Sequence, residues 1–180
     1  GAVLSAFLDA LTVTAVLITV AVGFFSVYHK VASGNELAAD GHDHTKDEGV
    51  LPEKAEQLEQ FRSFLRSLIM HGAVGTALGG VTTLVGEPQN LLIAEKAGWD
   101  FMTFFWKMAP VTMPVFICGL LTCIILEKTA ILGYGGTLPN DVRAVLEEFS
   151  EQEKQRRTPN DVAALIVQFA VALILVFALA

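Results

Sequence analysis

Asp9 is the first residue of this sequence whose type and surroundings suit ion chemistry. It stands in the run SAFLDALTVT, residues 5–14. On one continuous helix, Ser5, Asp9 and Thr12 would share a face, because positions i, i+4 and i+7 fall on the same side. Carboxylate and hydroxyl oxygens suit a hard cation, and low-dielectric surroundings favour the protonated form of a carboxyl group. Asp9 could therefore carry either a cation or a proton.

A second group of candidates lies in HGAVGTALGGVTTLVGEPQN, residues 71–90. Five glycines occur between residues 72 and 86, and Pro88 follows them. Glycine and proline are the two poorest residues in a helix interior, and the residue before a proline prefers an extended conformation. We therefore predict two half-helices joined by an unwound segment near residues 79–88.

Unwound backbone at membrane depth is tolerated where it lines a cavity, and broken helices of this kind build the ion sites of secondary transporters. The segment would offer carbonyl and hydroxyl oxygens to such a site, from Gly79, Gly80, Thr82 and Thr83. The N–H groups that are free at the start of the second half-helix, residues 88–90, would face the same place.

Three ionisable groups remain at membrane depth, and each keeps a structural alternative. A charge there costs on the order of 3 kcal/mol on insertion scales, which marks it as a functional candidate by default. Asp9 could instead be the N-cap of the following helix at the membrane surface. Glu87 is either an ion ligand or a half-helix cap open to a water-filled vestibule. His71 is either a packed neutral side chain or a proton relay.

The elements that must position these groups are membrane helices. The 180 residues are 53% apolar and 17% charged, whereas soluble domains carry about 25% charge. Four stretches contain no Asp, Glu, Lys or Arg, namely residues 10–27, 67–86, 108–126 and 162–180. Each approaches the roughly 20 residues that a transmembrane helix needs. We predict an all-α integral membrane protein in a lipid bilayer. Because the sequence starts and stops inside apolar runs, we expect further segments of a longer chain as partners.

Polar segments separate the membrane segments. Residues 33–49 are rich in Gly and Asp, so we expect a mobile linker at 29–50. Apolar residues recur at helical spacing in 51–66 and in the loop 128–161, which predicts two amphipathic helices at the interface. The membrane segments are a helix at 1–28, the discontinuous helix at 67–97, an outer loop with a helix at 98–127 and the start of a further helix at 162–180.

The placement of Lys and Arg predicts the orientation. Four occur between residues 28 and 63, two in the next connection and five in residues 128–161. The positive-inside rule then places residues 29–66 and 128–161 in the cytoplasm. The net charge of −7 comes from the loops and disfavours nucleic acid as a partner. No nucleophile–base pair or metal motif lies at membrane depth, so we expect neither an enzyme nor a cofactor.

The two motifs resemble the ion transporter superfamily and are most similar to the bacterial NhaB-type sodium/proton antiporters. The superfamily pattern joins a Ser/Asp/Asn-rich hairpin tip to a broken helix of the form Gly-Gly-x-x-Thr-x-x-Gly-x-Pro-Pro-Asn. Here it reads SAFLDALTVTAVLI at residues 5–18 and GGVTTLVGEPQN at residues 79–90. Two residues depart from it: Ala10 replaces the Asn of many relatives, and Gln89 replaces the second Pro. Because Ala10 offers no amide ligand, Asp9 becomes the more important candidate ligand of the hairpin tip.

The resemblance implies an inverted-repeat transporter with a scaffold and a moving domain, often a homodimer, in the bacterial inner membrane. Residues 1–28 would then form a re-entrant hairpin arm with Asp9 near its tip. The tip and the break would together bind sodium, through Asp9, Thr12, Gly79, Gly80, Thr82, Thr83 and Asn90. Sodium and protons would be the exchanged species, with Asp9 as the exchanging carboxylate.

Two other functions remain open. The first is sodium-coupled uptake of an anion such as a dicarboxylate, whose carboxylate could meet the N-terminus of the second half-helix, although Asp9 would repel it. The second is a membrane module that transports nothing, in which Gly75-x-x-x-Gly79 only brings helices close together.

Overall fold

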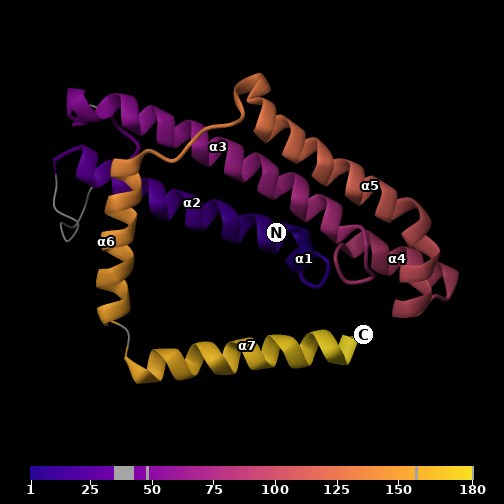
Figure 1. The fold of residues 1–180 in the computed structure, drawn as a ribbon. Helices are drawn as coiled ribbons and strands as arrows, with labels where there is room; N and C mark the ends of the chain where they lie inside the picture. The colour runs from indigo at the N-terminus through magenta and orange to yellow at the C-terminus, as the bar shows by residue number, and fades with distance from the viewer. Residues whose placement is uncertain (35–42, 48, 157, 180) are drawn as a thin grey trace. The chain divides into compact units, whose positions relative to one another are not determined.

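The structure is a computed structural model that describes residues 1–34, 43–47, 49–156 and 158–179. Over these residues it consists of helices and connecting segments, with no strand, which confirms the all-α prediction (Figure 1). Residues 35–42 and 48 of the predicted mobile linker lie outside the described part. The helices are α1 (Ala2–Ser5), α2 (Ala10–Ala32), α3 (Pro52–Gly80), α4 (Pro88–Ala97), α5 (Phe101–Thr129), the short 3₁₀ helix η1 (Ile131–Gly133), α6 (Asn140–Arg156) and α7 (Pro159–Leu179).

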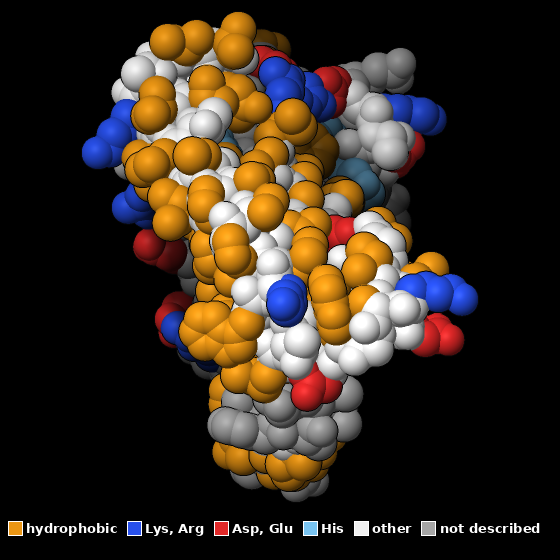
Figure 2. All heavy atoms as spheres, turned by 90° about the vertical axis from the view of Figure 1, so that its right-hand side faces the viewer, with side chains coloured by type: hydrophobic (Ala, Val, Ile, Leu, Met, Phe, Trp, Pro, Cys, Tyr) orange, Lys and Arg blue, Asp and Glu red, His pale blue; other side chains and the backbone are white. Residues whose placement is uncertain are grey.

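Among the described residues, α2 and α5 are the two helices long and apolar enough to cross a membrane. They contain the predicted stretches 10–27 and 108–126. Only 11% of the most apolar window of α2 and 6% of that of α5 is buried, whereas the core helix of a soluble protein would be mostly buried. In Figure 2, hydrophobic side chains cover much of the visible face, and most of the charged ones lie toward its edges. These exposed apolar surfaces suit contact with lipid.

Helix α3 is continuous from Pro52 to Gly80, so it joins the predicted segment 51–66 to the first part of the segment 67–97. It ends where the sequence predicts a break: residues 81–87 are not helical and α4 begins at Pro88. Glu87 has the extended conformation expected before proline, with φ −146° and ψ 144°. The predicted break near residues 79–88 is therefore confirmed.

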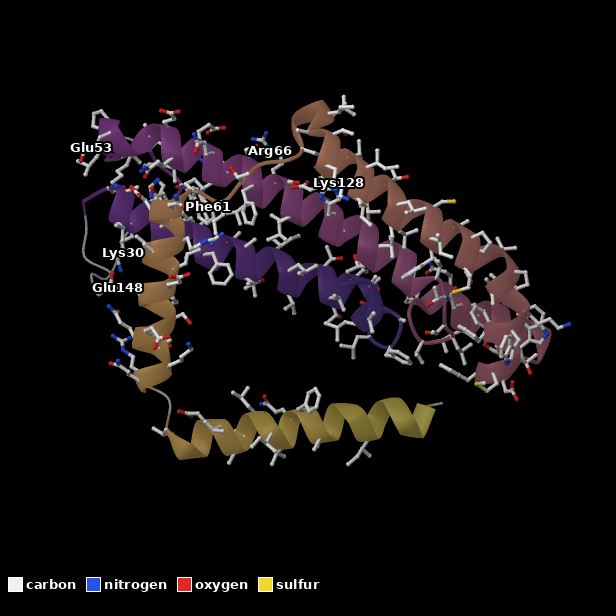
Figure 3. All side chains as sticks on the ribbon, in the orientation of Figure 1. Lys30, Glu53, Phe61, Arg66, Lys128 and Glu148 are labelled. Carbon is white, nitrogen blue, oxygen red and sulfur yellow. The ribbon has the colours of Figure 1, made fainter. Side chains whose placement is uncertain are left out.

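The chain forms two compact units, and α2, α3, α5 and α6 each contribute to both. The first unit comprises residues 1–14, 72–120 and 154–180, and the second comprises residues 15–71 and 121–153. The core of the second unit brings together side chains from α2, α3 and α6, namely Ala21, Tyr28, Ala32, Leu58, Phe61, Leu65 and Val142. In Figure 3, Phe61 points into this core from α3, whereas Arg66 points away from it.

Polar contacts border the core of the second unit. The Tyr28 hydroxyl donates to Oε1 of Gln57 at 2.9 Å, and Lys54 Nζ donates to a carboxylate oxygen of Asp141 at 2.9 Å. Val142 is fully buried, and Val145 and Leu146 pack against the same core. The apolar face that the sequence predicts in the loop 128–161 therefore packs onto α2 and α3.

Candidate functional site

Two interruptions of helical structure meet in the first unit: the turn at residues 6–9, between α1 and α2, and the segment 81–87, between α3 and α4. Figure 1 shows them side by side. The N–H of Ala10 donates to the carbonyl oxygen of Gly86 at 3.2 Å, and the Thr83 hydroxyl donates to the carbonyl oxygen of Ala6. The two motifs that the sequence singles out therefore lie against each other.

Glycines permit this close approach. A Cβ atom on Gly79 would overlap the carbonyl oxygen of Ala2 and the hydroxyl of Ser5, and one on Gly86 would overlap the carbonyl group of Gly80. A Cβ on Gly80 would lie 3.0 Å from the Glu87 side chain and 3.1 Å from Cβ of Ala10. A side chain at Gly79 would push the end of α3 away from α1, and one at Gly86 would push residue 86 away from Gly80.

The predicted oxygen ligands of the break bond to one another. Thr82 Oγ1 donates to the carbonyl oxygen of Gly79 at 2.6 Å. The amide nitrogen of Asn90 donates to the carbonyl oxygens of Gly80 at 3.0 Å and Thr83 at 2.8 Å. Thr82, Thr83 and Asn90 are each only 5% exposed. In this conformation these groups fix the shape of the break, and their role as ion ligands stays a prediction.

Asp9 caps a helix. Its carboxylate accepts hydrogen bonds from the N–H of Thr12 at 3.0 Å and from the Thr12 hydroxyl at 3.2 Å, which is the N-cap geometry at the start of α2. Ser5 belongs to α1, which ends before the turn. The prediction that Ser5, Asp9 and Thr12 share one helical face is therefore wrong, and the alternative of an N-cap describes the geometry of Asp9.

The same Asp9 lines a cavity of about 300 Å³ beside the two breaks, between the start of α2, α3 and the start of α4. Glu87 lines it as well, so two carboxylates share one cavity. The hydroxyl groups of Thr14 and Thr76, whose oxygens are 2.8 Å apart, lie on its wall. Its remaining lining residues are Ala10, Leu11, Ala73, Ala77, Pro88 and Gln89. Carboxylate and hydroxyl oxygens around a small space suit a hard monovalent or divalent cation.

Sequence reasoning missed Thr14 and Thr76. Thr14 lies four residues after Ala10, and its hydroxyl also donates to the carbonyl oxygen of Ala10 at 2.8 Å. Thr76 stands between the glycines of the broken helix and is 1% exposed. Its only signal was a hydroxyl in an apolar helix, because the contact between α2 and α3 cannot be read from local sequence.

Glu87 and Ser5 have defined partners. Gln89 donates to the Glu87 carboxylate, and Glu87 occupies the N-cap position of α4 without a capping bond from its side chain. The buried Ser5 hydroxyl donates to the carbonyl oxygen of Thr76 at 2.7 Å. Over the described residues, no group of three or more His, Cys, Asp or Glu side chains could hold a metal ion.

His71 lies in the second unit and is not among the cavity-lining residues. Its Nδ1 is 2.9 Å from the carbonyl oxygen of Ser67, and its Nε2 is 3.1 Å from that of Cys123. Glu127 lies 3.6 Å from the ring. Sequence reasoning missed Glu127, which stands just after the uncharged stretch 108–126.

Known proteins resemble this chain over its full length. The family model described as bacterial Na+/H+ antiporter B (NhaB) matches residues 1–180. Proteins named Na(+)/H(+) antiporter NhaB are 65% identical in Hahella chejuensis, 63% in Marinomonas sp. and 60% in Vibrio cholerae, each over 180 residues. The chain spans about a third of their length, 36%, 36% and 34% respectively. No solved structure matches.

Proposed function

We propose that this chain, which belongs to the NhaB family of bacterial Na⁺/H⁺ antiporters, is part of a secondary transporter that exchanges sodium ions for protons across the bacterial inner membrane. The family is one of transporters and not of enzymes. One observation carries the proposal: Asp9 and Glu87 line a single cavity at the meeting point of two helix breaks. The relatives' names support antiport and give no support to anion uptake or a packing module.

Competition at one carboxylate explains exchange. Deprotonated Asp9 presents a negative charge at the N-terminus of α2, beside the hydroxyl oxygens of Thr14 and Thr76, and attracts a sodium ion. A proton on Asp9 removes that charge and releases the ion. Glu87 in the same cavity makes the electrostatic potential there more negative, which favours a cation over an anion. Exchange then needs no separate coupling device.

The surrounding residues shape this site. Ser5 and Thr83 hold the two segments together, and hydrogen bonds of Thr82 and Asn90 fix the shape of the second break. Further oxygens for a sodium ion come, when the site rearranges, from Ser5, Thr12, Gly79, Gly80, Thr82, Thr83 and Asn90. Such rearrangement accompanies alternating access, in which one part of a transporter moves against another around a fixed site. In this proposal the moving part contains the two segments that lie against each other, residues 6–9 and residues 81–87.

We extend the proposal to the membrane arrangement. Residues 1–28 form a re-entrant hairpin arm, residues 67–97 form a discontinuous transmembrane helix, and both belong to one repeat of an inverted-repeat transporter. Residues 29–66 and 128–161 face the cytoplasm. The partners are the lipid bilayer, the remainder of the transporter and, in a homodimer, a second copy. The turn after α1 and the break after Gly80 support this arrangement, because each reverses or interrupts a helix.

The test is sodium-induced collapse of a pH gradient in vesicles that contain the full-length protein. We expect wild type to exchange and Asp9→Asn to lose exchange. Asp100→Asn is the matched control: Asp100 also caps a helix, accepting the N–H of Thr103 at 2.7 Å, but does not line the cavity. Equal exchange by wild type and Asp9→Asn would show that Asp9 serves only as the N-cap of α2. No exchange by wild type would reject antiport.

A further inference from the structure

A second cavity, of about 430 Å³, lies between α2 and α3 within the second unit. Arg62 and Arg66 line it, and because they are four residues apart on α3 they lie on the same side of that helix. Among the described residues, no Asp or Glu lines this cavity. Its other lining residues are apolar, namely Ala21, Val22, Phe25, Leu65, Ile69 and Met70. The cavity therefore combines an apolar wall with two positive charges.

The cavity lies where α3 changes from a polar helix to an apolar one. Residues 52–66 include six charged side chains, whereas residues 67–86 include none. Arg66 is thus the last charged residue before the membrane segment and suits the depth of lipid headgroups. Val22 and Met70, which line the cavity and are exposed, suit contact with acyl chains. A ligand with a charged head and an apolar tail would match both parts.

The two guanidinium groups already share one carboxylate. Glu59 has one carboxylate oxygen 3.5 Å from Nη1 of Arg62 and the other 4.0 Å from Nη2 of Arg66. Both contacts are long for ion pairs, and the Glu59 side chain is 63% exposed, so it can turn into water at little cost. An anionic group held by both arginines therefore fits at this place.

Arg62 is held in position from two further sides. Its Nη2 donates to the Asp47 carboxylate at 2.6 Å, and its Cζ lies 5.3 Å from the ring centroid of Phe25, within the range of a cation–π contact. Asp47 balances much of the charge of Arg62. Arg66, whose side chain is exposed, therefore has the larger share in attracting an anion.

We propose that this cavity binds an anionic phospholipid. The lipid phosphate takes the place of the Glu59 carboxylate between Arg62 and Arg66, and an acyl chain lies along the apolar wall. Guanidinium groups bind phosphate oxygens with paired hydrogen bonds, and basic pockets beside transmembrane helices bind anionic headgroups. This binding does not depend on antiport. The proposed membrane arrangement places the site in the leaflet that faces the cytoplasm.

The test uses phosphatidylglycerol with a photoactivatable diazirine on its acyl chain, in phosphatidylcholine vesicles that contain the full-length protein. We expect labelling of residues 21–25 and 62–70, located by peptide mass spectrometry and displaced by unlabelled phosphatidylglycerol. The same diazirine chain on phosphatidylcholine should label these residues roughly fivefold less or weaker still, because it lacks the net negative charge.

Three results would overturn the proposal. Equal labelling by the two lipids would show ordinary contact with the bilayer. Absence of labelling would show that another part of the transporter covers the cavity. Displacement of the probe by inorganic phosphate would make this a site for a free anion.

Two variants test the arginines. In Arg66→Gln, the fraction of phosphatidylglycerol probe that gives half-maximal labelling should rise by roughly fivefold, the effect of one arginine near an anionic surface. In Glu59→Gln this fraction should fall, because the competing carboxylate is gone, and a misfolded protein would not show such a gain. Arg143→Gln is the matched control, because Arg143 is exposed on α6 and does not line the cavity.

The two variants together decide the role of the arginines. If Arg66→Gln does not assemble, Glu59→Gln decides alone. A half-maximal fraction that neither variant moves would reject the site.

Discussion

Ser5 donates its hydroxyl proton to the backbone carbonyl oxygen of Thr76 at 2.7 Å, across 71 residues of sequence. The Ser5 residue is fully buried, so this bond fastens the end of α1 to the helix that leads into the break. It also places the turn at residues 6–9 against the segment 81–87. The position of Asp9 in the cavity therefore depends on a hydroxyl group that does not line it.

Removing this hydroxyl should weaken the first unit. Ser5→Ala removes a buried hydrogen bond to the Thr76 carbonyl, which costs about 0.5–1.5 kcal/mol. The measurement is the free energy of unfolding of the full-length protein in detergent. Thr19→Val is the control, because Thr19 is exposed and its hydroxyl bonds only within α2, to the carbonyl oxygen of Ala15. Equal stability of the two variants would contradict this role of Ser5.

Replacing Gly79 by alanine should change the stability of the protein in the opposite direction from replacing Gly23. Gly79→Ala places a methyl group against the Ala2 carbonyl and the Ser5 hydroxyl, and such overpacking costs about 1–3 kcal/mol or more. Gly23→Ala lies in α2 with nothing within 4 Å of the new Cβ, so it should stabilise the protein by roughly 0.5–1 kcal/mol. Thermal unfolding of both variants checks the opposite signs. A neutral Gly79→Ala would show that the end of α3 is not packed closely against α1.

The sequence allowed the break near residues 79–88 to be predicted because glycine and proline act locally, and Pro88 begins α4 as expected. The turn before Asp9 could not be predicted in this way. Residues 5–12 contain neither glycine nor proline, and the turn is held by partners far along the chain, such as the carbonyl of Gly86 bonded to the Ala10 N–H.

The residues of the site likewise fall into two groups, those that can be recognised in the sequence and those that only the packing of the helices brings to the site. Asp9 and Glu87 stood out because a charge in an apolar stretch is costly and therefore visible in sequence. Thr14 and Thr76 carry no charge, and each hydroxyl can bond to a backbone carbonyl of its own helix. Only the packing of α2 against α3 places their oxygens 2.8 Å apart on the cavity wall. The cavity thus combines residues of a recognisable type with residues selected by tertiary structure.

Asn90 should affect sodium affinity through the shape of the break. In Asn90→Asp, a carboxylate would face the carbonyl oxygens of Gly80 and Thr83 with no proton to donate, and the two bonds of the amide would be lost. We expect the sodium concentration for half-maximal exchange to rise by roughly tenfold or more, as expected for losing buried hydrogen bonds. Asn140→Asp makes the same change at an exposed position and should leave sodium dependence unchanged. An unchanged value in Asn90→Asp would mean that the break needs no internal donor.

Acid should release the segment before α3, through Asp47. The Arg62 guanidinium donates to the Asp47 carboxylate at 2.6 Å and holds its pKa below the ordinary value, and His29 contributes less through a contact of 3.2 Å. Because folding lowers this pKa, the contact stabilises the structure fully above the ordinary value near 4. Its contribution is lost as the pH falls through the lowered pKa.

This prediction can be checked by hydrogen exchange at residues 43–47 and 49–51, corrected for intrinsic rates, as the pH is lowered. Wild type should keep its protection until the pH is below the ordinary carboxyl value. Arg62→Gln removes the main cause of the lowered pKa, so protection should be lost at higher pH. Lys46→Gln is the control, because Lys46 is 71% exposed and pairs with Asp43 at 3.7 Å, and such surface pairs contribute little. If Arg62→Gln and wild type lose protection at the same pH, Asp47 does not hold this segment.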